Sequence, residues 1–181
     1  MGNDSGDTRD NSTERSAQAS QAQFAPKRMG ELAEMAFVYK AASLGFGVAK
    51  PYGDSHPYDF LIQHGRRLLR IQVKSVFAAR GEGRSGYAVA AARHRRRGRA
   101  IYSEDDIDFI AAFVAPHDAW YVIPVKALGG RKVVYLHPLG PSRRDGGMYE
   151  AYREAWHLMK DHGNRVMSIC VPSSPAANIP R

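Results

Sequence analysis

Apolar and polar residues alternate on both sides of a central turn in the segment Pro57–Ser75. Alternation with a period of two is typical of a strand that buries one face. The turn contains Gly65-Arg66, and glycine at the first central position of a two-residue loop is the signal for a type II′ hairpin. The segment therefore predicts two antiparallel strands joined by a tight turn.

The register of this hairpin follows from the same pattern, because Gly65-Arg66 as the loop sets Phe60 opposite Ile71 and Asp59 opposite Gln72. One face of the hairpin then collects apolar side chains, namely Phe60, Ile62, Leu69, Ile71 and Val73. The other face collects Asp59, Arg70, Gln72 and Lys74. A shift of one residue would place Asp59 in the apolar row. The pattern thus predicts a carboxylate, an amide and an ammonium group side by side.

The rest of the chain predicts an α/β domain. Ala33, Phe37, Ala41 and Leu44 recur at helical spacing, so we expect a helix over Lys27–Leu44 that ends at Gly45. A second, amphipathic helix is expected over Tyr149–Lys160. Further strands are expected at Phe46–Lys50, Tyr87–Ala92, Phe109–Ala115, Trp120–Pro124 and Lys132–Leu136.

Length and composition set the domain boundaries. The 181 residues are enough for one domain with a sizeable core. Residues 1–25 are polar and predict a disordered leader, residues 26–171 predict the folded domain, and residues 172–181 predict a flexible tail. The single Cys170 excludes an internal disulfide, and we expect it to be a buried apolar residue. Since the chain has no apolar stretch of membrane-spanning length and no signal-peptide core, we expect a cytoplasmic protein with no membrane partner.

Net charge favours a polyanionic partner. The chain carries 26 Lys and Arg against 18 Asp and Glu, a formal charge of +8. Five arginines lie close together in one segment: Arg93, Arg95, Arg96, Arg97 and Arg99. Such a cluster repels itself and attracts phosphates. We predict that this segment is a loop that contacts the DNA backbone, and it contains no base-reading pattern.

The polar face of the hairpin suits divalent-metal chemistry. Asp59, Gln72 and the backbone carbonyl of Val73 can offer oxygen ligands to a hard cation such as Mg²⁺. Lys74, on the same face, would lie near a phosphate or an attacking water. The competing interpretation is purely structural, with a Gln72–Asp59 hydrogen bond and a Lys74–Asp59 ion pair. Three nearby acids, Asp105, Asp106 and Asp108, are interpreted as a turn and strand entry rather than as metal ligands.

The motif Asp59 followed by Gln72-x-Lys74 resembles that of the PD-(D/E)XK endonuclease superfamily. Glutamine in place of the commoner acid resembles the group I intron homing endonuclease branch of that superfamily. The segment Lys27–Glu34, with glycine followed four residues later by glutamate, is similar to the first helix of the same group. The segment Tyr102–Pro124 resembles the strands that follow in the same group, and the similarity as a whole covers Lys27–Val125.

This resemblance implies a restriction-endonuclease-like core, a central mixed β-sheet flanked by α-helices. It implies a metal-dependent endonuclease that hydrolyses DNA phosphodiester bonds with Mg²⁺ or Mn²⁺. Asp59, Gln72, the Val73 carbonyl and Glu34 would bind the metal, with Glu31 as the second candidate for the helix carboxylate. Lys74 would position the water. The resemblance also implies double-stranded DNA as the partner and a homodimer or homotetramer as the assembly.

Two alternatives share the same pattern of residues. A Holliday junction resolvase-like nuclease has the same Gly-x-x-x-Glu and Asp…x-Lys layout. A non-catalytic nucleic-acid-binding module could use the same fold without a metal. Binding that is insensitive to Mg²⁺ and to Lys74→Ala would distinguish the module from either nuclease.

Overall fold

The computed structural model describes residues 26–79, 86–95, 98–140 and 147–161. The predicted leader, the predicted tail and residues 162–171, which include Cys170, lie outside the described residues. Arg96 and Arg97 also lie outside them, as do the side chains of His94 and Arg95.

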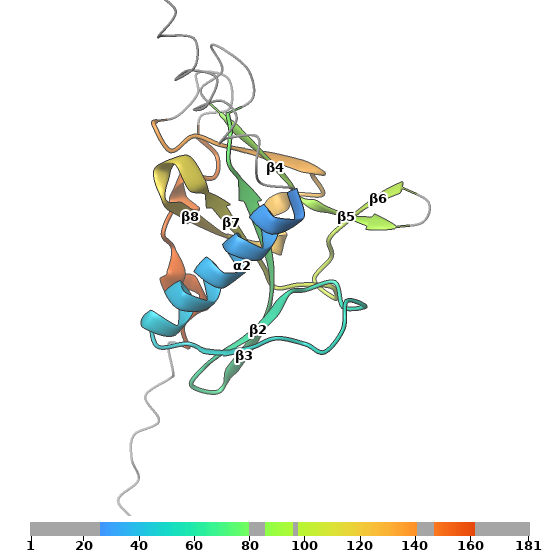
Figure 1. Cartoon of the computed structure of the whole chain (residues 1–181), viewed down its shortest axis with the longest axis vertical. Helices are drawn as coiled ribbons and strands as arrows, with labels where there is room; N and C mark the ends of the chain where they lie inside the picture. The colour runs from blue at the N-terminus through green and yellow to red at the C-terminus, as the bar shows by residue number, and fades with distance from the viewer. Residues whose placement is uncertain (1–25, 80–85, 96–97, 141–146, 162–181) are drawn as a thin grey trace, which may run out of the picture.

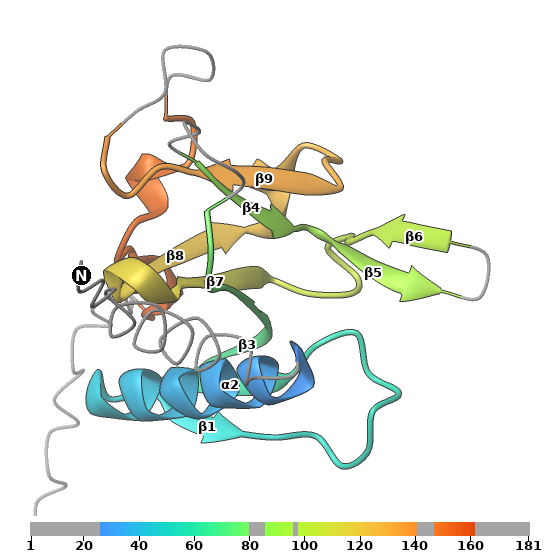
Figure 2. The same ribbon diagram turned by 45° about the horizontal axis from the view of Figure 1, so that its top comes forward.

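A five-stranded mixed sheet forms the centre of the domain (Figure 1). Its strand order is β1 (Gly47–Ala49), β2 (Phe60–His64), β3 (Arg67–Val76), β7 (Phe109–Val114) and β8 (Ala119–Pro124). Strands β3 and β7 pair in parallel, and the other neighbours pair antiparallel. The helix α2 (Pro26–Ser43) covers one face of this sheet (Figure 2). The predicted α/β class and mixed sheet are confirmed.

The central hairpin has the register that the sequence predicts. Phe60 pairs with Ile71, Ile62 with Leu69, and His64 with Arg67. Gly65 has φ of 60°, while Arg66 is not in the positive-φ region. This combination agrees with a type II′ turn, because a type I′ turn needs positive φ at both central residues. The local pattern of the sequence was therefore sufficient to place Asp59 beside Gln72.

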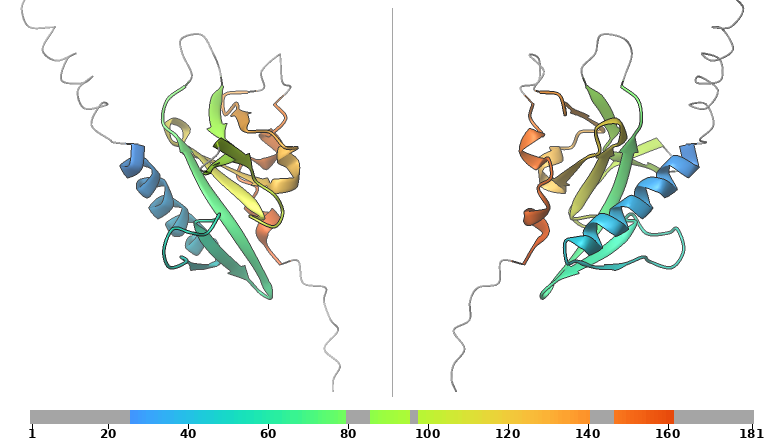
Figure 3. Two further views of the ribbon diagram at one scale, coloured as in Figure 1. Left: turned by 90° about the vertical axis from the view of Figure 1, so that its right-hand side faces the viewer. Right: turned by 60° about the vertical axis from the view of Figure 1, so that its left-hand side comes forward.

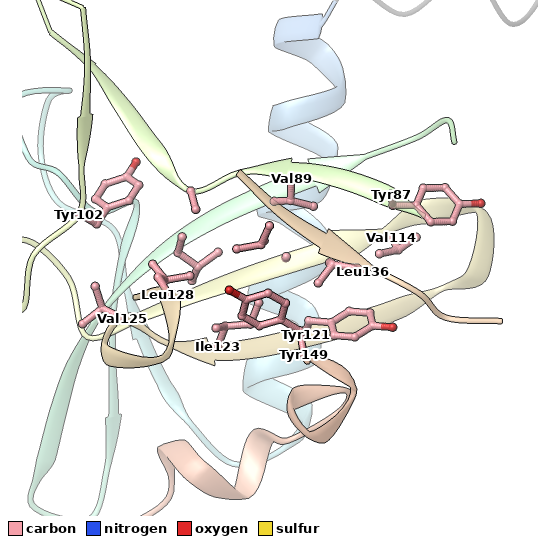
Figure 4. Packing of buried hydrophobic residues seen from close by; sticks show 14 of the residues in the cluster. Tyr87, Val89, Tyr102, Val114, Tyr121, Ile123, Val125, Leu128, Leu136 and Tyr149 are labelled. Atoms are coloured by element: carbon pink, nitrogen blue, oxygen red, sulfur yellow. The ribbon is translucent and has the colours of Figure 1, made fainter. Parts of the chain in front are cut away.

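Two apolar cores lie on opposite faces of the sheet. The first joins α2 to the five predicted apolar residues of the hairpin, and Phe37 lies at its centre, 5.3 Å from the ring of Phe60 and 5.9 Å from that of Trp120. The second packs β7 and β8 against a small sheet of β4 (Tyr87–Ala90) and β9 (Val133–Leu136) (Figure 4). Strands therefore cover the face where a second flanking helix would lie.

The predicted arginine loop is instead part of a two-stranded ribbon. Strand β5 (Ala92–Arg95) pairs with β6 (Gly98–Ile101), and this pair has no ladder to the central sheet. The ribbon projects from the body of the domain (Figure 2). The loop prediction was wrong, because the arginine-rich segment has too few apolar residues to show the pattern of a strand. Backbone pairing between the two short strands forms the ribbon, which has no core of its own.

The predicted helix over Tyr149–Lys160 is also corrected. The segment contains two 3₁₀ turns, η3 (Glu150–Tyr152) and η4 (Trp156–Met159), along the edge of the sheet (Figure 3, orange). Between them, the Trp120 carbonyl accepts the Glu154 backbone N–H at 2.7 Å, and Glu154 Oε1 accepts the Trp120 N–H at 2.8 Å. Glu154 has φ of 49°. Hydrogen bonds to the edge of β8 thus replace those of a helix.

Asp108 joins the two parallel strands at their start. Its Oδ2 accepts the Arg70 backbone N–H at 2.7 Å and the Arg70 Nε–H at 3.1 Å, and its own N–H donates to the Arg70 carbonyl. Asp106 accepts the N–H and the hydroxyl of Ser103, both at 3.1 Å. The structure therefore supports the interpretation of these acids as turn and strand-entry residues.

The helix α2 has further features that agree with the prediction. Ala33, Phe37 and Ala41 are buried, and the helix is followed by Gly45 with φ of 87°.

Among the residues that the structure describes, no helix has the length and apolar character needed to cross a membrane.

Replacement of Asp108 by alanine should weaken the junction of β3 and β7. The substitution leaves the Arg70 backbone N–H without its acceptor and removes an ion pair, so we expect the free energy of unfolding to fall by about 1–3 kcal/mol. Chemical denaturation measures this loss. Mn²⁺ affinity, measured by calorimetry, should stay unchanged. A variant of normal stability with weakened Mn²⁺ binding would show that Asp108 is a metal ligand instead.

Candidate active site

The candidate site lies at the N-terminal end of β2, where β3 continues beyond the first pair of the hairpin ladder. The last paired residues are Phe60 and Ile71, so β3 has an open edge from Gln72 onward on this side. Val73 would then have an unpaired backbone N–H, but Asp59 Oδ2 accepts it at 2.8 Å. Asp59 thereby takes the place of a strand partner, and its carboxylate is held against the edge of β3.

A cavity of about 310 Å³ opens beside this carboxylate. It is lined by two residues of α2 that are one helical turn apart, Gly30 and Glu34, and by Ala33 between them. The strand side of the lining comes from Asp59, Gln72, Val73, Lys74 and Ser75. Helix side chains lean toward the N-terminus, so the Glu34 side chain extends over the Gly30 position, which carries no side chain of its own. A Cβ at residue 30 would meet no atom within 4 Å, so this part of the entrance is open.

Of the six residues predicted for the metal and catalytic site, the structure brings five together and separates the sixth. Glu34, Asp59, Gln72, Val73 and Lys74 line the same cavity. Glu31 is exposed and is not among the lining residues. The prediction ranked Glu34 ahead of Glu31, and the geometry favours the same residue.

Gln72 is buried and both ends of its amide are bonded. Its Nε2 donates to Asp59 Oδ2 and, at 3.2 Å, to the carbonyl of Val73. Its Oε1 accepts the hydroxyl of Tyr102 at 3.2 Å. The hydrogen bond to Asp59 that the structural interpretation predicted is therefore present, together with an oxygen-rich pocket around it.

Charge at the site is strongly influenced by burial. Burial raises the pKa of the Asp59 carboxyl to about 6, although the Val73 N–H and Lys74 act in the opposite direction. Burial also lowers the pKa of the Lys74 ammonium, and Asp59 and Glu34 offset part of that change. The Asp59 carboxylate is costly to ionise in a cavity lined by oxygen atoms, and a bound cation would stabilise its charged form.

The donor set also sets a limit on the metal. Among the described residues, no group of three or more His, Cys, Asp or Glu side chains is placed to share an ion. The cavity has two acids, Glu34 and Asp59, one amide and one backbone carbonyl. Such all-oxygen ligands suit a hard cation such as Mg²⁺ or Mn²⁺ rather than zinc.

Two contacts of the site were missed by the sequence reasoning. The Lys50 ammonium lies 2.7 Å from Glu34 Oε2, and this interaction raises the Lys50 pKa. Tyr102 bonds Gln72 from 30 residues away in the chain. Both partners are distant in sequence, and their spacing follows no local period, so no pattern along the chain could have identified them.

The arginines predicted to contact DNA lie in different surroundings from one another. Arg93 forms an ion pair with Asp106 at 2.8 Å and is mostly covered, whereas Arg99 is exposed on β6. Both line a surface groove of about 660 Å³ at the base of the ribbon, together with Lys132. The side chain of Arg95, and residues Arg96 and Arg97, lie outside what the structure describes.

Comparison with known proteins agrees with this geometry. The family model described as PD-(D/E)XK endonuclease matches residues 24–159, and the chain belongs to this family. Its structure is similar to that of a bacterial homing endonuclease, I-Ssp6803I, with 33% sequence identity, a TM-score of 0.64, and coverage of 75% of this chain and 93% of that chain. The fold is thus a restriction-endonuclease-like α/β core, and the protein is a nuclease.

A second structural neighbour is the Holliday junction resolvase Hjc of Archaeoglobus fulgidus, with 17% identity and a TM-score of 0.46. The match covers 75% of this chain and 99% of that one. The search of curated proteins found no match.

The buried charge of Asp59 should destabilise the metal-free protein above pH 6. Asp59 has a folded pKa of about 6 against an ordinary value of 3.8. The folded state therefore binds this proton more tightly than the unfolded state. Stability from this group is present below about pH 4 and is lost as pH rises through 6.

In EDTA at pH 7, Asp59→Asn should consequently be as stable as the wild type or more stable, by up to about 3 kcal/mol. Thermal or chemical unfolding at pH 4.5 and pH 7 measures the difference, with the exposed Asp54→Asn as the matched control. Addition of Mn²⁺ should stabilise the wild type and not Asp59→Asn. A large destabilisation of Asp59→Asn at pH 7 would contradict the prediction.

Proposed function

We propose that this nuclease is an endonuclease that hydrolyses phosphodiester bonds of double-stranded DNA with Mg²⁺ or Mn²⁺. The observation that carries the proposal is the shared cavity of Glu34, Asp59, Gln72, Val73 and Lys74. The family match and the basic ribbon support it. A cytoplasmic location and assembly as a homodimer or homotetramer belong to the same proposal.

Each residue of the cavity has a proposed role. Asp59, the Gln72 amide oxygen, the Val73 carbonyl and Glu34 would hold the cation. A divalent cation in such a site lowers the pKa of a bound water and offsets negative charge at the scissile phosphate. The chain itself excludes bulk water from the buried side of the cavity and keeps the oxygen ligands in fixed positions.

Lys74 is the residue proposed to act on the reacting groups. It lies on the same strand face as Gln72 and two residues further on, so its ammonium approaches the cavity from the sheet. There it can donate hydrogen bonds to the attacking water and to a phosphate oxygen, where charge builds up in the transition state. Lys50, paired with Glu34, supplies a further positive charge near the entrance.

The ribbon is the proposed DNA contact. Arg99 is exposed on β6, whereas Arg93 is committed to Asp106. We therefore assign the phosphate contact to Arg99 and keep Arg95, Arg96 and Arg97 as predicted contacts from the sequence. Arg93 contributes by holding β5 against the Ser103–Asp106 turn.

Plasmid cleavage tests the active site directly. Wild-type protein should nick or linearise DNA in Mg²⁺ or Mn²⁺ and should be inactive in EDTA. Lys74→Ala and Asp59→Asn should each lower the rate at least about 100-fold, since each removes a group that acts on the transition state. Glu31→Gln, outside the cavity, is the matched control and should retain activity.

The substrates in this assay separate the alternatives. Linear duplex, supercoiled plasmid, randomised duplex pools and four-way junctions are compared under the same conditions. Preferential cutting of four-way junctions would favour a resolvase-like activity. Absence of cutting on every substrate, with metal-independent DNA binding, would contradict the endonuclease proposal and favour a binding module.

Salt dependence tests the ribbon. Arg99→Ala should weaken duplex binding and reduce the slope of log K against log salt by about 1, because one phosphate contact is lost. Arg66→Ala is the control, since it removes the same charge from the exposed β2–β3 turn. Fluorescence anisotropy in EDTA measures binding without cleavage. Equal effects of the two substitutions would show that only net charge matters.

A further inference from the structure

Tyr102 reaches the candidate metal site from a different part of the fold. It directly follows β6, at the base of the ribbon, and Figure 4 shows it at one end of the second apolar core. Only 6% of its surface is exposed. Its hydroxyl bonds Gln72 Oε1 at 3.2 Å, while its ring packs with apolar neighbours.

The orientation of the Gln72 amide gives this contact its importance. In the structure, Nε2 faces Asp59 and the Val73 carbonyl, and Oε1 faces Tyr102. This orientation is favourable without a cation, because an N–H group then meets the carboxylate. However, a cation held by Asp59 needs the amide oxygen on that side, since an amide N–H group cannot act as its ligand.

A half-turn of the amide exchanges its two ends. Oε1 would then face Asp59, and Nε2 would face Tyr102. A tyrosine hydroxyl can accept a hydrogen bond as well as donate one, so Tyr102 can satisfy the amide in both orientations. An apolar residue at this position would leave Gln72 Oε1 without this donor in the observed orientation and Nε2–H without an acceptor in the metal-binding orientation. The second loss costs more free energy, because a buried N–H group without a partner is tolerated less well than an under-satisfied carbonyl oxygen.

We propose that Tyr102 is a positioning residue: by accepting the Gln72 Nε2–H, it stabilises the amide orientation in which the oxygen faces the cation. The inference rests on the metal-dependent function proposed above. It is specific to glutamine, because the two oxygens of a carboxylate are equivalent and need no such selection. Tyr102 would thereby allow the neutral Gln72 to act as a metal ligand at the motif position where an acid is commoner.

The surroundings of Tyr102 are suited to this task. Asp106 accepts the N–H and the hydroxyl of Ser103, the next residue, and pairs with Arg93 on β5 at 2.8 Å. The turn that follows Tyr102 is also bonded by the Arg70 guanidinium, through the carbonyls of Glu104 and Asp105. The ring is thus fixed from both the ribbon and the central sheet, which is what precise orientation of a ligand requires.

Calorimetric titration with Mn²⁺ alone, without DNA, tests the proposal. Tyr102→Phe should bind Mn²⁺ about 10-fold more weakly than the wild type, the size of effect typical of a residue that orients a metal ligand. Tyr87→Phe is the matched control. Tyr87 is 7% exposed and its hydroxyl bonds His117 Nε2 at 2.9 Å, and it does not line the cavity. This control should bind Mn²⁺ as the wild type does.

The same titration in a Gln72→Glu background separates orientation from general packing. With a carboxylate at residue 72, Tyr102→Phe should weaken Mn²⁺ binding by less than about threefold, because no amide remains to be oriented. An equal loss in both backgrounds would show a merely structural role and would overturn the proposal. Unchanged Mn²⁺ affinity of Tyr102→Phe in the glutamine background would overturn it as well.

Failure of the proposed function gives a different result. If the wild type binds no Mn²⁺, the metal site itself is wrong, and the role of Tyr102 is overturned with it. If Mn²⁺ binding follows the expected pattern while no DNA substrate is cut, the role of Tyr102 is supported and the endonuclease proposal alone fails.

Discussion

The hydrogen bond between the Asp59 carboxylate and the Val73 N–H is the contact on which the site depends. Strand β2 begins at Phe60, two residues short of a pairing with Val73, and a buried backbone N–H must find an acceptor. The side chain of Asp59 provides it. One contact thus completes the edge of β3, holds a half-buried carboxylate in place, and brings it beside Gln72 and Lys74. The structural and the chemical function of Asp59 therefore depend on the same side chain.

The balance of charge around the cavity follows from that arrangement. Glu34 and Asp59 contribute the negative charges, and Lys50 and Lys74 lie close to them. Glutamine at residue 72 keeps the total one unit less negative than an acid would. Its amide therefore has to be oriented, whereas a carboxylate would only have to be present. The side-chain contacts of the amide, to Asp59 at Nε2 and to Tyr102 at Oε1, come from different parts of the chain.

What the sequence predicted best was local. The hairpin register was confirmed from the Phe60–Ile71 pair to the His64–Arg67 pair, because a period of two and a glycine turn leave few alternatives. The resemblance ranked Glu34 ahead of Glu31, but the helix period places both near the same stripe, and the structure distinguishes them because Glu34 alone of the two lines the cavity. The segment Tyr149–Lys160 had a convincing apolar period, yet its backbone bonds the edge of β8. Tertiary hydrogen bonds outweighed local propensity there.

The parallel pairing of β3 with β7 has a consequence for how the enzyme reaches its working form. Arg70 and Asp108, which meet at the start of this pair, are 38 residues apart, and the ribbon lies within the intervening crossover. Contacts over such distances form late, because a long loop must close before they contribute. During synthesis, the hairpin with Asp59 and Gln72 emerges well before Tyr102 and β7. Newly made chains would therefore pass through a stage in which the ligands exist but are not yet oriented, which delays catalysis until the whole domain has closed.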